Sequence, residues 1–255
     1  MKQGLKKSVW VFLGLLLLMN AGCKKIEFDL EHPENFDING IITLKTIPDS
    51  IGPISADGIS EVTFQAVIDP NSSEKVITFS ATSGTFIGAQ NTNKIAVPIN
   101  NNGFAEAELR VGTRPGEVEV TASVLNFRAI VVLELDRAYA DNLSGDSSTP
   151  SVKTDGSIMA VIKALLSRGE NRGAVSVGTT VTFQATQVSD QNIEISVGRF
   201  LNGNSAVTDE KGIATNTFAA DTGNVAVGKP VKIKIITRKD DNSHLEVELY
   251  LNVIQ

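Results

Sequence analysis

Histidine, tryptophan and cysteine are scarce in this chain, and each scarcity narrows what the protein can do. The 255 residues contain two histidines, one tryptophan and one cysteine. A single cysteine excludes an intrachain disulfide. The two histidines, His32 and His244, do not form a plausible metal-ligand or proton-transfer pair in the sequence. We therefore expect neither a disulfide-stabilised fold nor a histidine-based active site.

Motifs of the common catalytic and cofactor sites are also missing. The chain has no Gly-x-Ser-x-Gly nucleophile turn, no glycine-rich phosphate loop, no zinc-ligand spacing and no EF-hand calcium loop. Asp240 and Asp241 could hold a weakly bound cation at a turn, although a solvated turn is the interpretation we favour. Three acidic pairs alternate with apolar residues: Glu106 and Glu108, Glu117 and Glu119, Glu246 and Glu248. Because alternation places such pairs on outward strand faces, we predict no enzymatic activity, no cofactor and no metal.

Basic residues are in the minority. The chain carries 23 Lys and Arg against 29 Asp and Glu. Three of the lysines lie in residues 1–22, which contain no acid, so the rest of the chain has 20 positive and 29 negative side chains, a net charge of −9. A chain this acidic repels phosphate backbones and anionic lipid surfaces. Nucleic acid is therefore not expected as a partner.

The chain opens with an apolar run that is too short to cross a bilayer. Residues 1–22 contain three lysines, then an apolar run over residues 9–19, then two small residues before Cys23. These are the three parts of an export signal. The run covers 11 residues, whereas a membrane-spanning helix needs about 20. Residues 1–22 are therefore predicted to be a cleaved signal peptide.

The position of the cysteine indicates what kind of signal this is. Residues 15–23 resemble a bacterial lipobox, in which small residues precede a cysteine that receives a diacylglycerol after export. Asn20 departs from that pattern, which usually has Leu three residues before the cysteine. The resemblance implies lipid attachment at Cys23, where two or three acyl chains, at about 0.8 kcal/mol per buried methylene, would anchor the protein stably. By resemblance to enterobacterial lipoproteins, in which an acidic residue after the cysteine keeps the protein at the inner membrane, the basic Lys24 implies the outer membrane. The alternative is an ordinary secretory signal followed by an incidental cysteine.

Beyond the cysteine the dominant pattern is period-two alternation of apolar and polar residues. Residues 23–36 show no sustained period and are predicted to be a tether. From residue 37 on, alternating runs bounded by Gly, Pro or Asn predict short, half-buried strands. Residues 157–167 could form a helix, because apolar residues lie nearly all round it, but we favour a strand there by comparison with residues 61–68. The pattern predicts an all-β sandwich.

The strand pattern occurs twice in the same order. The matched segments are 57–59 with 155–157, 77–82 with 181–186, 84–86 with 198–200, and 102–105 with 211–214. Fixed order at offsets between 98 and 114 residues is what duplication of a domain leaves behind. The break is predicted near residues 136–150, where Asp, Asn, Ser, Gly and Pro cluster. The predicted domains are therefore residues 37–136 and 137–255.

Both halves resemble bacterial immunoglobulin-like domains of the invasin and intimin type. The first half carries Ala56-Asp57-Gly58, Ile77-Thr78-Phe79, Gly84-Thr85-Phe86, Asn102-Gly103-Phe104-Ala105 and Val118-Glu119-Val120-Thr121-Ala122. The second half departs from this pattern by an insertion around residues 187–195 and by Lys232-Ile233-Lys234 in place of Val-Thr-Ala. The resemblance implies two tandem immunoglobulin-like β-sandwich domains. It leaves the function open, because such domains serve as stalks, spacers and adhesive tips.

The signal and the fold together predict a non-catalytic, lipid-anchored outer-membrane lipoprotein that faces the cell surface or the periplasm. We expect an accessory or docking subunit, or an adhesive spacer, whose partners are the membrane and another outer-membrane or cell-surface protein. Edge strands of the sandwiches would offer the docking surface. The alternative is a surface glycan-binding lipoprotein. Its sugar platform would have to be Tyr250 on an outward face, because the only tryptophan, Trp10, belongs to the signal.

Overall fold

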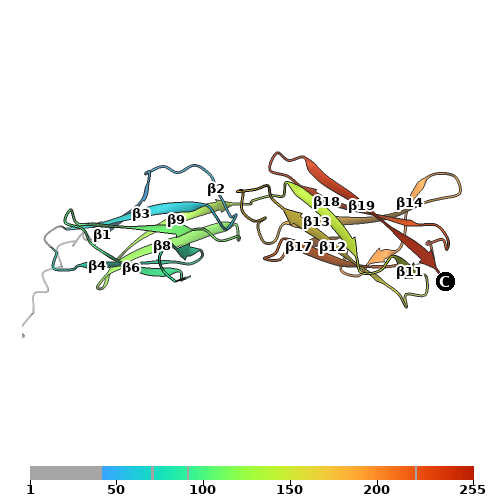
Figure 1. Ribbon diagram of the computed structural model, residues 1–255, viewed down its shortest axis with the longest axis horizontal. Coiled ribbons are helices and arrows are strands. Elements are labelled where there is room, and N and C mark those ends of the chain that lie inside the picture. The colour runs from blue at the N-terminus through green and yellow to red at the C-terminus, as the bar shows by residue number, and fades with distance from the viewer. Residues whose placement is uncertain (1–41, 70–71, 91, 222) are drawn as a thin grey trace, which may run out of the picture. The chain divides into compact units, whose positions relative to one another are not determined.

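The computed structural model describes residues 42–69, 72–90, 92–221 and 223–255, and this part of the chain is built of strands and turns. No helix that could span a membrane is found among these residues. Residues 39–255 form one compact unit. Within it, two separate hydrophobic cores are each enclosed by a pair of sheets (Figure 1). The prediction of an all-β fold with two tandem immunoglobulin-like sandwiches is confirmed.

The first sandwich packs a four-stranded sheet against a five-stranded one. The four-stranded sheet has the order β1 (Ile42–Ile47), β3 (Glu61–Ile68), β7 (Phe104–Arg110) and β5 (Thr85–Phe86). The five-stranded sheet has the order β2 (Ile54–Ser55), β9 (Phe127–Asp136), β8 (Gly116–Val124), β4 (Val76–Ala81) and β6 (Lys94–Pro98). Neighbouring strands are antiparallel, except that β2 runs parallel to β9.

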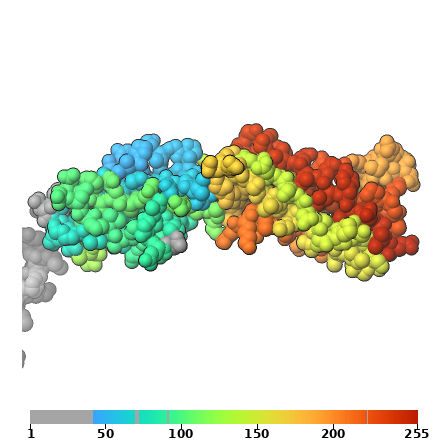
Figure 2. Space-filling model, in the orientation of Figure 1, coloured from blue at the N-terminus to red at the C-terminus, as the bar shows by residue number. Residues whose placement is uncertain are grey.

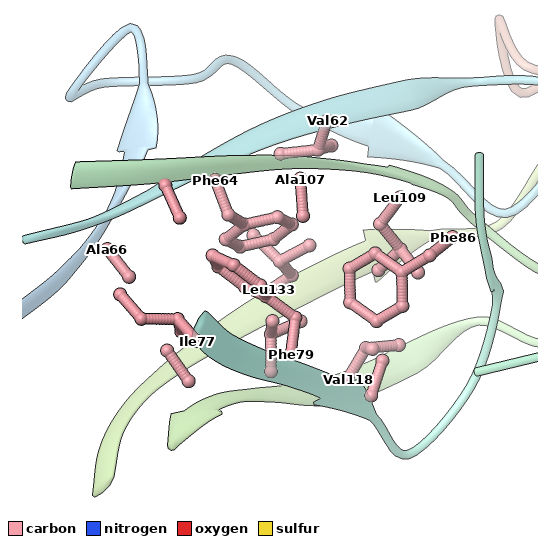
Figure 3. Packing of buried hydrophobic residues seen from close by; sticks show 14 of the residues in the cluster. Val62, Phe64, Ala66, Ile77, Phe79, Phe86, Ala107, Leu109, Val118 and Leu133 are labelled. Atoms are coloured by element: carbon pink, nitrogen blue, oxygen red, sulfur yellow. The ribbon is translucent and has the colours of Figure 1, made fainter. Parts of the chain in front are cut away.

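Alternation along the strands produces the core of this sandwich. Phe64 of β3 and Phe79 of β4 are fully buried and point into the space between the sheets (Figure 3). The rings of Phe79 and Phe86 lie 6.2 Å apart in a tilted arrangement, a geometry that aromatic pairs prefer. Burial of each such side chain contributes roughly 1.5–3 kcal/mol, so these phenylalanines are major contributors to the stability of the sandwich.

The second sandwich repeats this arrangement with one additional strand in its larger sheet. Its four-stranded sheet has the order β10 (Asn142–Ser147), β12 (Ala160–Ser167), β17 (Ile213–Ala219) and β15 (Arg199–Phe200). Its larger sheet has the order β11 (Ser151–Lys153), β19 (His244–Ile254), β18 (Val231–Arg238), β13 (Thr180–Val188) and β14 (Glu194–Ser196), with β16 (Ser205–Val207) also paired to β13. Again one short strand, β11, runs parallel to the strand beside it.

Several sequence predictions are confirmed by this arrangement. The ambiguous segment 157–167 contains the strand β12, whose residues are alternately buried and exposed. The two Asp-Gly turns are structural, because each aspartate carboxylate accepts the backbone N–H two residues later at 2.9 Å, from Ile59 to Asp57 and from Ser157 to Asp155. Such bonds hold the chain in a tight turn.

The segment around the predicted break, residues 136–150, contains the strand β10, which the alternation pattern did not predict. This strand pairs with β12 along its length. Polar residues and Gly145 outnumber its apolar residues, so its sequence shows no alternation. The glycine has a packing reason, since a Cβ at Gly145 would lie 2.8 Å from Cδ1 of Ile235. The limits 37–136 and 137–255 remain predictions, because residues 39–255 form one compact unit.

Candidate functional site

The predicted lipid-attachment residue Cys23 and the tether histidine His32 lie outside the described residues. Within the described part, no group of three or more His, Cys, Asp or Glu side chains could hold a metal ion. His244 is the exposed first residue of β19.

Asp240 and Asp241, at the turn between β18 and β19, are both engaged within the protein. The Ser243 hydroxyl and then its backbone N–H donate to the Asp241 carboxylate, at 2.5 and 2.9 Å, and lower the pKa of that carboxyl. Asp240 accepts from Nη2 of Arg172 at 2.8 Å. The turn thus uses its acids for local hydrogen bonds and for ion pairing.

Buried polar contacts join the two sandwiches. The hydroxyl of Ser176 is buried, donates to the carbonyl of Ala56 at 2.7 Å and accepts the N–H of Ala138 at 2.8 Å. Two residues earlier, the N–H of Ala174 donates to the carbonyl of Asp57 at 2.7 Å. The loop between β12 and β13 therefore donates hydrogen bonds to the carbonyls of Ala56 and Asp57, in the turn that follows β2. Buried carbonyl groups need such partners.

A buried ionic cluster lies beside these bonds. The side chain of Arg168 is only 5% exposed, with Nη1 3.9 Å from Oδ2 of Asp57 and Nη2 3.5 Å from Oδ2 of Asp240. Among the described residues, Nε and Nη1 of Arg168 have no hydrogen-bond acceptor. Asp57 instead accepts the backbone N–H groups of Ile59 and Ser60. The cluster connects the Asp-Gly turn of the first sandwich with the β18–β19 turn of the second.

Gly173 allows the loop to come this close. Its φ is +74°, and a Cβ there would lie 2.4 Å from the carbonyl oxygen of Asp57 and 2.8 Å from Cγ1 of Ile59. Sequence reasoning missed this junction. A weak signal was present, since residues 168–173 hold two arginines and two glycines in an acidic chain. No comparable signal marks Ser176.

An apolar strand edge stands out on the first sandwich. We call Arg128, Ile130, Val132 and Glu134 the β9 edge; they alternate along the outward side of β9. Ile130 and Val132 are 43% and 56% exposed. Beside them, residues 51–54 and 132–134 line a groove of 330 Å³. Figure 2 shows the segment before β2, in blue, standing out from the rest of this sandwich. Two neighbouring exposed apolar side chains beside a groove make this strand a candidate contact surface.

The corresponding strand of the second sandwich, β19, carries charge instead. Lys232 pairs with Glu194, and its Nζ lies 3.6 Å from Glu248. The hydrogen bond with Glu194 raises the pKa of Lys232. On the next position of the same face, Lys234 lies 3.0 Å from Glu246. The face is a ladder of cross-strand ion pairs, as expected for a solvated sheet.

The two tyrosines of the described region lie in different surroundings. Tyr250 points outward as predicted, is 62% exposed, and donates its hydroxyl to Glu248 at 3.0 Å, which raises its pKa. The ring of Tyr139 is covered by Arg238, with the guanidinium carbon 5.4 Å from the ring centre. Only Tyr250 offers a bare ring face on which a sugar could stack.

Solved structures show what this architecture is similar to. The adhesin InvE of Yersinia pseudotuberculosis matches with a TM-score of 0.58 and 18% identity over 83% of this chain. Invasin, a bacterial integrin-binding protein, matches with a TM-score of 0.52 and 18% identity, also over 83%. The chain spans 59% of the first structure and 39% of the second. No protein-family model and no curated protein matches the sequence. The likeness confirms the predicted invasin-type immunoglobulin-like fold.

Proposed function

We propose that this protein is a non-catalytic, lipid-anchored lipoprotein of the outer membrane. It acts as a docking subunit or adhesive spacer for another outer-membrane or cell-surface protein. The junction around Ser176 carries this proposal, because its buried hydrogen bonds hold both sandwiches in one unit. A spacer needs that property if a contact at one sandwich is to be held at a fixed place. The adhesin InvE, which has a similar fold, supports a surface role.

The anchor is supported by the sequence alone. An export signal that ends at a lone cysteine after two small residues resembles a bacterial lipobox, and this resemblance supports lipid attachment. Cys23 is therefore the residue on which the location of the protein depends.

Substitution of the cysteine tests the anchor. Cys23→Ala should move the protein from the membrane fraction to the water-soluble fraction and abolish incorporation of labelled fatty acid. Lys25→Ala, two residues further on, is the matched control and should stay with the membrane and keep the label. Unchanged sedimentation of the Cys23→Ala protein with membranes would contradict the proposal.

Extraction of native membranes in mild detergent tests the docking role. A docking subunit should co-purify with the same outer-membrane protein in repeated preparations, whereas a solitary adhesive spacer should not. Gly173→Ala is an informative variant, because it perturbs the junction without changing the β9 edge or Tyr250. A docking partner that is retained in full by a chain with a broken junction would show that the rigid connection is irrelevant to the function.

Glycan capture is the second candidate, and the exposed ring of Tyr250 is the observation that favours it. Retardation on polysaccharide gels measures it directly. If the surface binds glycans, Tyr250→Ala should abolish retardation, and Tyr139→Ala, which removes a ring already covered by Arg238, should not. If docking to a protein is the function, the unchanged protein itself should show no retardation.

A further inference from the structure

Among the described residues, β2 is the only strand that pairs with β9 on the side away from β8. β8 pairs with β9 in a register that runs unbroken from Phe127 to Leu135, whereas β2 reaches only Leu135 and Asp136 on the other side. The carbonyl of Asp136 accepts the N–H of Ala56, so the backbone groups of Asp136 point away from β8. Backbone groups alternate in direction along an antiparallel strand. The N–H and C=O groups of the β9 edge, which lies two, four, six and eight residues earlier, therefore also point outward.

The side chains of the β9 edge are arranged symmetrically about Val131. Arg128 and Glu134 stand three residues to either side of it, and Ile130 and Val132 flank it. Antiparallel pairing of two such strands centred on Val131 would place Arg128 of each opposite Glu134 of the other. Ile130 would then lie opposite Val132. Ile130 and Val132 offer outward backbone groups, so the same register permits hydrogen-bonded pairs at its centre. At Glu134 only the side chain takes part, because its carbonyl already faces Ile54 of β2.

Two other edge strands lack this self-complementarity. β6, the opposite edge of the same sheet, ends in Pro98, which has no N–H to donate, and begins with the exposed Lys94. In β19 the N–H of Asn252 bonds to Pro150, so by the same alternation Glu246 and Glu248 point their backbone groups outward. If β19 paired with itself in an antiparallel register centred on Val247, Glu246 of each copy would face Glu248 of the other, and the two negative charges would repel. Proline and repeated charge are devices that prevent edge-to-edge association.

We propose that the β9 edge binds the β9 edge of a second copy of this chain, in the antiparallel register centred on Val131. The two larger sheets of the first sandwiches then form one continuous sheet. The ladder ends where Ile54 already pairs with Leu135. The groove of 330 Å³, lined by residues 51–54 and 132–134, then lies beside residues 128–130 of the other copy. This inference goes beyond the proposed function, because self-pairing needs neither the lipid nor a docking partner.

A single cysteine placed at the symmetry centre tests the register. In a non-hydrogen-bonded antiparallel pair the opposing Cα atoms are about 4.5 Å apart, and a disulfide needs roughly 4.4–6.8 Å. The full-length Val131→Cys chain, oxidised on intact cells, should therefore yield a disulfide-linked homodimer. The chain with Cys23 alone is the control and should give none. An adduct between Val131→Cys and a different protein would overturn the proposal.

Charge reversal then separates self-pairing from any other contact. Within the Val131→Cys chain, Arg128→Glu or Glu134→Arg should each reduce the disulfide dimer at least tenfold, because like charges face each other twice. The double variant should restore it. Two differently tagged single variants expressed together should form heterodimers only. Lys94→Glu, the same charge change on the opposite edge of the sheet, should have no effect.

A second measurement guards against misfolding. The mass of each detergent-extracted chain, with Val131 intact, should follow the same pattern by light scattering, while the far-ultraviolet circular dichroism spectra stay alike. A double variant that is folded but remains monomeric would overturn the proposal, and so would an Arg128→Glu chain that dimerises as well as the unchanged protein.

Discussion

The two sandwiches share their strand arrangement, apart from one additional strand in the second, but they differ in the long strand next to the short parallel one, β9 in the first and β19 in the second. In the first, β9 presents Ile130 and Val132 to solvent between a single arginine and a single glutamate. In the second, β19 presents consecutive outward acids that are tied to lysines on β18. Residues that pack in a core are constrained by volume, whereas outward residues are not. The copies therefore keep their topology and diverge at their edges, and the contacts that distinguish them must lie there.

The cores differ less than the edges. Phe79 and Phe183 occupy equivalent positions on β4 and β13, and both are fully buried. Each packs in a tilted contact with the phenylalanine of the following short strand, Phe86 at 6.2 Å and Phe200 at 5.7 Å. This equivalence allows the two sandwiches to be perturbed at matched positions.

The largest expected effect comes from emptying these matched positions. Phe79→Ala and Phe183→Ala should each lower the free energy of unfolding by about 3–5 kcal/mol, because each leaves a cavity in a close-packed core. Chemical denaturation measures this, with circular dichroism following both sandwiches. Tyrosine fluorescence follows only the second, which holds Tyr139 and Tyr250. Since the junction couples the sandwiches, Phe79→Ala should also shift the tyrosine transition. A tyrosine transition that does not move would mean that the sandwiches unfold independently.

A smaller effect is expected from the junction itself. Gly173→Ala should cost about 1–3 kcal/mol through left-handed backbone strain, and it also drives a Cβ against the carbonyl of Asp57. Denaturation should then separate into two transitions. Gly178→Ala is the matched control, because its φ is +77° but the nearest atom to its Cβ would be Nη1 of Arg137 at 3.8 Å. If both variants unfold in one transition at the same midpoint, the close approach at Gly173 does not couple the sandwiches.

The smallest effect is an acid sensitivity of the second sandwich. The pKa of Asp141 is lowered by the N–H of Gly169 and by Arg172, and the pKa of Asp221 is lowered by Arg199. A carboxyl with a lowered folded-state pKa stabilises the fold above its unfolded pKa of about 3.9, and this contribution disappears as the pH falls through the folded value. The denaturant concentration at the midpoint of the tyrosine transition should therefore decrease once the pH is lowered below about 4.

Asp141→Asn should reduce that pH dependence and should lower the midpoint at pH 7, where the charged form is present. Asp209→Asn is a useful comparison, because the pKa of Asp209 is lowered chiefly by backbone N–H groups of its own turn, from Ile213 and Lys211. An Asp141→Asn chain whose midpoint changes with pH as in the unchanged protein would contradict this assignment.

Much of the fold could be predicted from the sequence because the pleat of a half-buried strand imposes alternation locally. Residues 61–68 and the strand β12 both show it, and Asp-Gly pairs mark turns for equally local reasons. β10 escaped prediction, because Gly145 and its polar neighbours follow no such alternation and the glycine is explained only by contact with Ile235. Its fit depends on a strand far away in the sequence.

The candidate surfaces were less predictable. The junction joins Ser176 to Ala56, which lie 120 residues apart in the sequence. The residues around either position show no pattern that predicts this hydrogen bond. The outward face of Tyr250 followed from alternation, whereas the openness of β9 depends on where β2 ends. The lipid on Cys23 stays a prediction of the sequence.

The bond between Ser176 and Ala56 also has a consequence for how the protein is made. A ribosome completes residues 42–136 well before residue 176, so the turn that follows β2 must wait for its last hydrogen-bond donors. A chain cut after Asp136 would leave the carbonyls of Ala56 and Asp57 permanently without them. If one sandwich were exchanged for another, these hydrogen bonds would therefore be kept only if the loop between β12 and β13 is transferred together with the turn that it completes.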